Sequence, residues 1–363
     1  MTMSFFQRMV LFVLLMSTTS VMMAQVKFVN EFLNIGVGAE AHGKFGSVVA
    51  TVDDITAGYW NPAGLTEIDA NFQAGAMHAN WFGGIANYDY IAFGKRINEE
   101  KGSFAALSLI RMGIDNIPYT LNLISPDGTV DYNNISEFSA ADYAMLMSYA
   151  THLGSKNLSI GGNIKVIHRS IGSFASAWGF GFDVGAQYRK SNFALGASVR
   201  DVTSTFNAWS FSLTDQEKDV FQQTNNDIPV SSTEIALPRL ILGGAYFGNR
   251  GAIDYSLEAN VNISSNGTES GIASGNNFSL DPTLGMSIGF NKKVYVRAGI
   301  GNIQRIINDT NGSETTLEIQ PNIGMGLRLG KIKVDYALAN VADVTGALKS
   351  HIFSVVLDFN KRR

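Results

Sequence analysis

Alternation of apolar and polar residues with a period of two dominates the chain from Asn71 to the C terminus. In 158–166, 178–188 and 253–263, apolar side chains occupy every second position, and Gly, Ser, Asn or charged residues fill the positions between them. Stretches this long and regular indicate strands, because successive side chains of a strand point to opposite faces. The same pattern predicts about fourteen strands, at 72–81, 87–97, 102–112, 142–153, 157–168, 177–189, 192–200, 238–248, 251–263, 280–290, 293–302, 316–329, 331–340 and 350–359.

The connections between these strands alternate between short and long. Tight turns at 98–101, 154–156, 190–191, 249–250, 291–292 and 330 are separated by longer connections at 113–141, 169–176, 201–237, 264–279, 303–315 and 341–349, and only the first connection, 82–86, breaks the rule. Outer-membrane barrels have short periplasmic turns and longer outer loops. We therefore predict an all-β transmembrane barrel of the bacterial outer membrane over residues 71–363, with about fourteen antiparallel strands and both mature termini in the periplasm.

Composition supports a membrane protein. Of the 363 residues, 45% are hydrophobic and only 16% are charged, whereas soluble domains carry roughly 25% charged residues. No stretch beyond residue 25 approaches the about 20 apolar residues of a transmembrane helix. A soluble antiparallel sandwich would also alternate, but so many long strands with Lys, Arg, Asp and Glu on one face fit a lipid-facing barrel better. The net charge of -4 gives no support to nucleic-acid binding, and the lack of Cys excludes disulfides.

The first 70 residues differ from the rest. Residues 1–24 resemble a secretory signal peptide, with Arg8, an apolar stretch at 9–16 and small residues before Ala24; an N-terminal anchor is the alternative. Residues 25–70 contain a possible short helix around 39–44 and the turn Asn61-Pro62-Ala63-Gly64. A segment this short cannot form its own core. We predict that it folds into the barrel mouth as a plug, with a flexible periplasmic tail as the alternative.

Motifs for catalysis are not convincing. The sequence Gly-Met-Ser-Ile-Gly at 285–289 fits a hydrolase nucleophile elbow, but it lies within continuous alternation where that motif needs a sharp turn into a helix. The five histidines include no pair at the spacing of metal ligands. We therefore expect no enzymatic activity, no cofactor and no metal site.

Three other sets of residues are candidates for function. The alternation turns charged side chains of both signs toward the lumen, which indicates salt-bridged walls around a plug. These lumen-facing residues are Lys165, Asp183, Arg189, Glu258, Arg297, Arg328, Lys333, Asp335 and Asp358. The connection 201–237 is a candidate partner-contact loop, because it carries the apolar side chains Phe206, Trp209, Phe211 and Leu213. Packing of these side chains on the barrel rim is the alternative. The last strand carries an apolar stripe suited to the barrel assembly machinery: Val355, Leu357 and Phe359.

The same alternation assigns the lipid-facing side of the wall. Apolar residues at alternate positions of several strands are predicted to face lipid: Leu158, Ile160, Ile164, Phe180, Phe182, Tyr255, Leu257, Ile288 and Phe359.

The N-terminal segment also carries a family resemblance. The stretch from Phe32-Leu33-Asn34-Ile35-Gly36 through Asp53-Asp54 to Gly58-Tyr59-Trp60-Asn61-Pro62-Ala63-Gly64-Leu65 resembles the N-terminal region of the PorV/PorQ family, within the larger FadL-like group of outer-membrane barrels. Segments 296–299, 334–337 and 351–359 are similar to that family as well. The resemblance implies a fourteen-stranded barrel with an N-terminal plug.

The resemblance implies two different functions. PorV-like members bind the C-terminal signal domains of cargo for type IX secretion, whereas FadL-like members conduct hydrophobic molecules inward. Glu40, His42 and Lys44 depart from the family pattern, so assignment to PorV itself does not follow. We expect a cargo-binding or accessory component of type IX-like secretion, with a FadL-like uptake channel for molecules such as long-chain fatty acids as the alternative. The expected partners are outer-membrane lipids, the barrel assembly machinery, and either cargo domains with secretion proteins or a hydrophobic ligand.

Overall fold

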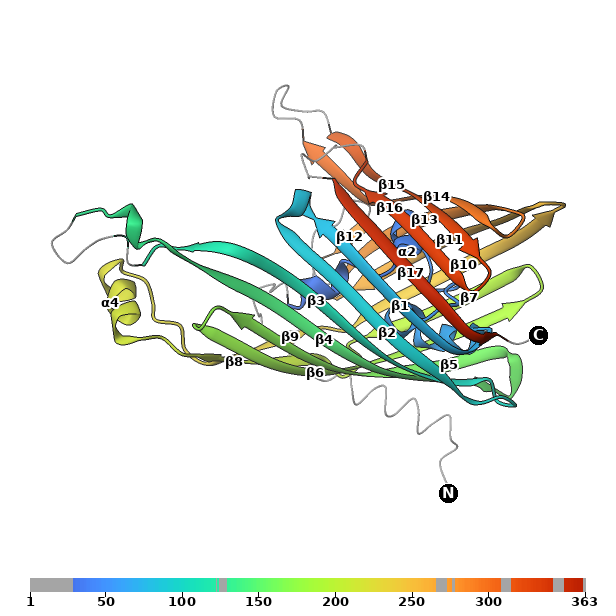
Figure 1. The fold of residues 1–363 in the computed structure, drawn as a ribbon, viewed down its shortest axis with the longest axis horizontal. Helices are drawn as coiled ribbons and strands as arrows, with labels where there is room; N and C mark the ends of the chain where they lie inside the picture. Colours follow the sequence, from blue (N-terminus) through green and yellow to red (C-terminus); the bar gives the residue numbers. More distant parts are fainter. Residues whose placement is uncertain are drawn as a thin grey trace, which may run out of the picture.

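Fourteen antiparallel strands close into a barrel in this computed structural model, which describes residues 29–121, 123, 129–265, 273–275, 278–307, 315–341 and 349–361. Each strand pairs with the next, and β17 pairs with β1 to close the ring (Figure 1). The predicted fold class is therefore confirmed. The wall strands are β1 (Ala70–Trp81), β2 (Ala86–Asn98), β3 (Ser103–Tyr119), β4 (Ser136–Leu153), β5 (Ser155–Ile171), β6 (Ala175–Lys190), β7 (Phe193–Arg200), β10 (Arg239–Arg250), β11 (Ile253–Ser264), β13 (Phe278–Phe290), β14 (Val294–Ile307), β15 (Thr315–Leu329), β16 (Ile332–Ala339) and β17 (Ser350–Lys361).

The period-two pattern of the sequence becomes two faces of the wall. On β5, Ile164 is 47% exposed on the outside, whereas the neighbouring Lys165 is 3% exposed and faces inward. On β6, Phe182 is 45% exposed while Asp183 is 6% exposed. Apolar side chains thus cover the exterior of the wall, and buried polar side chains face the lumen, as expected for a barrel surrounded by lipid.

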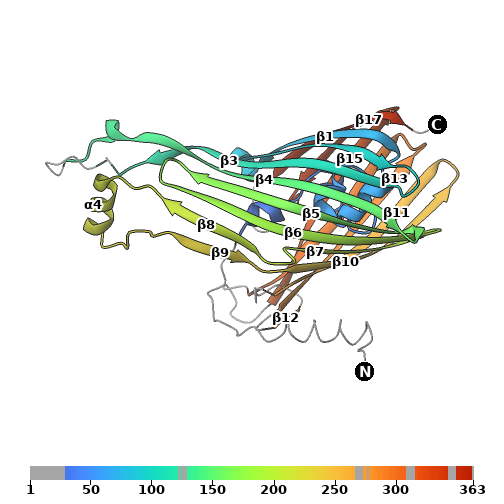
Figure 2. The ribbon, with the colours of Figure 1, turned by 90° about the horizontal axis from the view of Figure 1, so that it is seen from below.

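The wall is much longer on one side at the end that carries the long connections, called here the long-loop end. The sequence predicts loops at 113–141 and 201–237, but β3 and β4 run through much of the first, and β8 (Thr205–Phe211), α4 (Asp215–Gln223) and β9 (Ser232–Ala236) occupy the second. Strand β8 continues β7 along β6 after a bulge in which Asp201 and Ser204 adopt positive φ values. Figure 2 shows β3 to β6, β8 and β9 projecting together beyond the other strands.

Residues 29–69 lie inside the barrel and are called the plug. They form η1 (Glu31–Asn34), α2 (Ala39–Gly43), α3 (Ala57–Trp60) and η2 (Pro62–Glu67), joined by tight turns. Single 3-10 turns, η3 (Phe82–Gly84) and η4 (Tyr132–Asn134), and the short strand β12 (Ala273–Gly275) complete the described elements. None of the helices in the described ranges is long and apolar enough to cross a membrane. The predicted signal peptide, 1–24, lies outside the described residues.

Candidate functional site: the plug and the barrel wall

The turn Asn61-Pro62-Ala63-Gly64 joins α3 to η2 and fixes the plug to the wall. The Asn61 side chain accepts a hydrogen bond from the backbone N–H of Ala63 (3.2 Å), and Pro62 begins η2, where its missing N–H costs nothing. The amide of Asn61 donates to the carbonyl oxygens of Val49 (2.8 Å) and Ala186 (3.0 Å). A Cβ at Gly185 would lie 2.0 Å from the Asn61 side-chain oxygen, so only glycine admits this contact. The motif is thus an anchor between plug and β6.

One side of the plug is apolar. Ile55, Leu65 and Ile68 are almost completely buried against the inner face of the wall between β1 and β5. The wall contributes large side chains to the same cluster, all nearly inaccessible: Tyr88, Tyr90, Phe104, Ile110, Leu146 and Ile167. The Tyr90 hydroxyl donates to the carbonyl oxygen of Ile55 (3.0 Å). This surface, called here the apolar face, lets plug and wall meet through hydrophobic contact.

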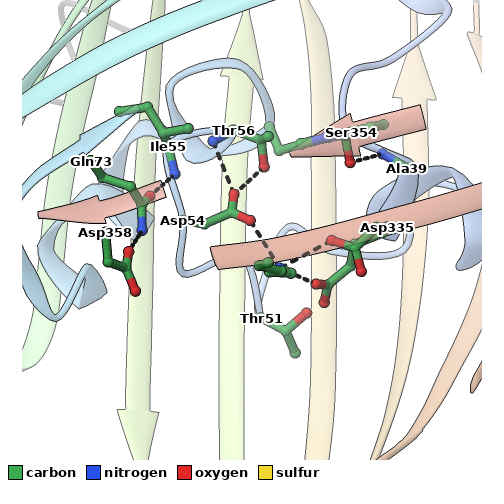
Figure 3. A network of polar contacts seen from close by, with 12 residues as sticks. Ala39, Thr51, Asp54, Ile55, Thr56, Gln73, Asp335, Ser354 and Asp358 are labelled. Atoms are coloured by element: carbon green, nitrogen blue, oxygen red, sulfur yellow. Dashed lines mark hydrogen bonds and ion pairs between the residues drawn. The ribbon is translucent and has the colours of Figure 1, made fainter. Parts of the chain in front are cut away.

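The opposite side of the plug is charged and is called here the ionic face. Glu40 of α2 pairs with Lys44 one helical turn later (3.1 Å), with Arg297 of β14 (3.0 Å) and with Lys333 of β16. Lys333 also pairs with Asp54 of the plug (3.1 Å). Arg297 reaches Asp335 of the wall (2.7 Å). The ionic face thus joins three plug residues to three wall residues, and Figure 3 shows Asp54 and Asp335 as two carboxylates of this network, both of which pair with Lys333.

Burial and charge pull the Glu40 pKa in opposite directions. Burial raises the pKa of the Glu40 carboxyl, but Arg297, Lys333 and Lys44 outweigh it and hold the value well below its ordinary range. Glu40 therefore remains ionised inside the barrel at neutral pH. Around it, Asp54 accepts from the backbone and hydroxyl of Thr56, and the Ser354 hydroxyl of β17 accepts from the N–H of Ala39 (3.0 Å), as Figure 3 shows.

His42 is the titratable group in the middle of α2. It is 5% exposed, its Nε2 donates to the carbonyl oxygen of Gly36 (3.2 Å), and its ring lies 5.4 Å from that of Trp81. Burial lowers the pKa of His42 to about 4, against the opposing effect of the Gly36 carbonyl. The imidazole is therefore neutral at pH 7, and acid would protonate it inside the plug.

The remaining lumen-facing candidates also bind the plug or each other. Lys165 lies between Asp183 (3.0 Å) and Asp201 (2.6 Å). Glu258 accepts from the N–H of Ala50 (2.8 Å) and the hydroxyl of Thr51.

Two further lumen-facing candidates also have hydrogen-bond partners. Arg189 donates to the carbonyl oxygen of Thr51 (2.8 Å), and Asp358 accepts from Gln73 (2.6 Å). Glu258 and Arg189 thus bind the plug, whereas Lys165 and Asp358 pair with side chains outside it.

A cavity of about 360 Å³ lies beside the ionic face, near the short turns. Glu40, Lys44, Arg297, Arg328 and Lys333 line it together with Tyr295. Among the described residues no group of three or more His, Asp or Glu side chains is arranged to hold a metal ion. The cavity is therefore a polar chamber bounded by the plug and the wall, in which Lys44, Arg297 and Lys333 already pair with Glu40.

The candidate partner-contact loop is not a loop. Phe206, Trp209 and Phe211 lie on β8, and Leu213 follows it, half-buried. Phe206 is 51% exposed on the outside of the wall, opposite Phe180 of β6. The Trp209 indole N–H donates to Glu234 (2.9 Å), its ring packs 5.2 Å from the Arg169 guanidinium, and Phe211 stacks beside it. Residues 206–211 pair with β6, but β8 is too short for the alternation of the sequence to predict this strand.

Sequence reasoning also missed the plug half of the ionic face. Glu40 and Lys44 stand out only as departures from a family pattern, although their spacing of four residues is that of an ion pair on a helix. Asp54 appears only as part of an acidic pair. The apolar stripe of the final strand lies on β17, where Val355 and Phe359 are exposed on the outside and the strand pairs with both β16 and β1.

Solved structures of outer-membrane transport proteins share the fold of this chain. The toluene transporter TodX of Pseudomonas putida matches with a TM-score of 0.57 at 12% identity, covering 89% of this chain and 98% of that one. The toluene transporter TbuX of Ralstonia pickettii matches with a TM-score of 0.55 at 13% identity (89% and 98%). A FadL homologue of Pseudomonas aeruginosa matches at 0.53 and 12% (90% and 98%).

These likenesses establish the fold that this chain shares with FadL-type barrels. No protein-family model matches the sequence, and no curated protein matches it. At identities this low, a structural likeness shows the fold alone, so function must be argued from the site.

Proposed function

We propose that this protein is an outer-membrane channel that takes up hydrophobic small molecules. The observation that carries the proposal is the apolar face, which runs between plug and wall inside a closed barrel. A polar solute gains nothing from such a surface, whereas a hydrophobic molecule can replace the contacts that plug and wall make with each other. The fold shared with hydrocarbon transporters supports the same function.

The proposed route requires plug and wall to separate at the apolar face. The ionic face holds the other side of the plug, because its buried charges would lose their partners if plug and wall separated there. Movement is therefore expected on the apolar side, with the ionic face acting as the fixed side of the plug.

Two engineered disulfides test this route, because the chain has no cysteine of its own. The first, Thr66→Cys with Ser159→Cys, replaces two hydroxyl oxygens that lie 2.7 Å apart between η2 and β5, on the apolar side. The second, Ser47→Cys with Thr283→Cys, replaces a pair 2.8 Å apart between plug and β13, near the ionic face. We expect oxidation to stop uptake of a labelled hydrophobic compound in the first variant only, and a reductant to restore it. Uptake unchanged in the oxidised first variant would exclude this route.

A second function has one specific observation in its favour. Trp209 and Phe211 form an aromatic pair on the inner side of the projecting wall at the long-loop end, where a cargo domain could dock, and the plug sequence resembles the PorV/PorQ family. This supports an accessory role in type IX-like secretion. Trp209→Ala with Phe211→Ala should then reduce surface display of secreted proteins and leave hydrophobic uptake unchanged. The uptake function predicts unchanged display.

A further inference from the structure

Positive charges mark every hairpin at the end of the barrel that carries the short turns, called here the short-turn end. Six hairpins join wall strands there, and each has at least one Lys or Arg at or beside its turn. All are exposed, and within the part of the chain that the structure describes none of them forms an ion pair. We call these residues the cation ring: Lys101, Lys156, Lys190, Arg250, Lys292, Lys293 and Lys331.

Each member of the ring stands within four residues, along the chain, of an apolar side chain exposed on the outside of the wall. Lys292 lies between Phe290 and Val294, and Lys331 lies between Leu329 and Ile332, all of them exposed. Exposed apolar residues also stand within four positions of the other cations: Ile97, Leu153, Phe193 and Ile253. A cation just beyond an apolar exterior is placed where headgroups of a bilayer lie.

The opposite end of the barrel has the reverse charge. Among the described residues, the connections between wall strands at the long-loop end contain seven acidic residues and two basic ones, Lys218 and Lys349. The acidic residues are Asp131, Asp201, Asp215, Glu217, Asp219, Asp227 and Glu234. Solubility alone does not call for such separation of sign between the two ends. The cation ring is therefore a feature of one membrane surface, while Glu99 and Glu100 beside Lys101 make the first hairpin its weakest position.

We propose that the cation ring binds the phosphate groups of anionic phospholipids that surround the short-turn end. Ammonium and guanidinium groups form charge-assisted hydrogen bonds with phosphate oxygens, and cations at a membrane surface attract anionic lipids. The arrangement favours lipid over a protein partner, because the cations are spread over all six hairpins around the barrel. A protein would contact one contiguous patch, whereas an annulus of lipid contacts every hairpin.

Lipid enrichment around the full-length protein tests this proposal. The protein is placed in vesicles of phosphatidylethanolamine with a minor fraction of phosphatidylglycerol, and the lipids that remain bound are quantified by native mass spectrometry. The test variant combines Lys156→Gln, Lys190→Gln, Lys292→Gln and Lys331→Gln. The matched control, Lys218→Gln with Lys349→Gln, removes two cations from the connections of the long-loop end.

We expect the wild type and the control to enrich phosphatidylglycerol, and the test variant to lose about fivefold of that enrichment at each altered hairpin, since each cation near a surface contributes about that factor. Equal binding of both lipids by the wild type, or unchanged enrichment in the folded variant, would overturn the proposal. Preference for lipopolysaccharide, or capture of an acidic protein without lipid preference, would overturn it as well.

A measurement on the wild type keeps the proposal testable if the variant fails to fold, as judged by heat-modifiable gel mobility. Enrichment of phosphatidylglycerol should fall as salt approaches about 1 M, where the screening length is about 3 Å. Enrichment that does not respond to salt would contradict a charge-based site.

Discussion

The two faces of the plug hold it in the barrel by different physical means. At the apolar face, Leu65 and Ile68 pack on large wall side chains, so separation costs hydrophobic contact that another apolar molecule can replace. At the ionic face, Glu40 and Asp54 share Lys333, so separation strands charges away from water. One side of a plug can therefore be fixed by buried charges, while the contacts on its other side can be replaced by contacts with an apolar molecule.

The largest expected effect comes from removing one member of the ionic face. Lys333→Met leaves Asp54 and Glu40 without a shared cation in a buried site. Losing one partner of a buried pair costs about 3–5 kcal/mol. Hydrogen exchange of the plug amides in micelles should show that much loss in the free energy of plug opening. Unchanged protection would show that the ionic face does not fix the plug.

A cavity on the apolar face should cost somewhat less. Leu65 is 0% exposed, so Leu65→Ala removes buried methyl groups and is expected to lower the same opening free energy by about 3 kcal/mol. Hydrophobic uptake should not fall in this variant, because the route becomes easier to open. A variant with a loosened plug and slower uptake would argue against the apolar face as the route.

Acid should weaken the plug through His42. Its pKa is about 4 in the folded protein and about 6.5 when unfolded, so its contribution is complete above pH 6.5 and is lost as pH falls toward 4. Between pH 7 and pH 5 the loss should be about 2 kcal/mol. Protonation of Glu40 adds to this loss of stability only below the pKa that Glu40 has in the unfolded chain, because its pKa in the folded protein is lower than that value. His42→Phe should remove most of the pH dependence of the opening free energy above pH 5. If the pH profile is unchanged by this substitution, the dependence arises from another group.

The smallest expected effect is the coupling between the faces. If they act independently, Lys333→Met and Leu65→Ala together should lower the opening free energy by the sum of the separate losses, within about 0.5 kcal/mol. A larger coupling energy would show that the plug moves as one body, and the distinction between a fixed and a replaceable side would not hold.

The wall could be predicted from the sequence, whereas the contacts of the plug could not. Alternation is a local signal, and a one-residue error would turn Lys165 and Ile164 to the wrong faces, so the strands are well specified. The wall partners of Glu40 lie more than two hundred residues away on β14 and β16, and no local pattern connects them to it.

Two errors at the long-loop end have a local cause. Strand β9 has only five residues, Ser232–Ala236, and β8 has seven, Thr205–Phe211, which is too short for alternation to stand out among polar residues. Helix α4 begins with a capping box at Thr214 and Glu217, a signal that was present in the sequence but lay inside a presumed loop.

Uptake by living cells tests the proposed transport of hydrophobic molecules by this barrel. Cells that lack their own channels for hydrocarbons and fatty acids would produce the wild-type protein, and entry of labelled toluene and of a labelled long-chain fatty acid would be followed at early times. We predict faster entry of at least one of these compounds than in cells with an empty vector, and no change for a small hydrophilic solute. Entry at the empty-vector rate for both hydrophobic compounds, from a barrel shown to be folded in the outer membrane, would contradict the account.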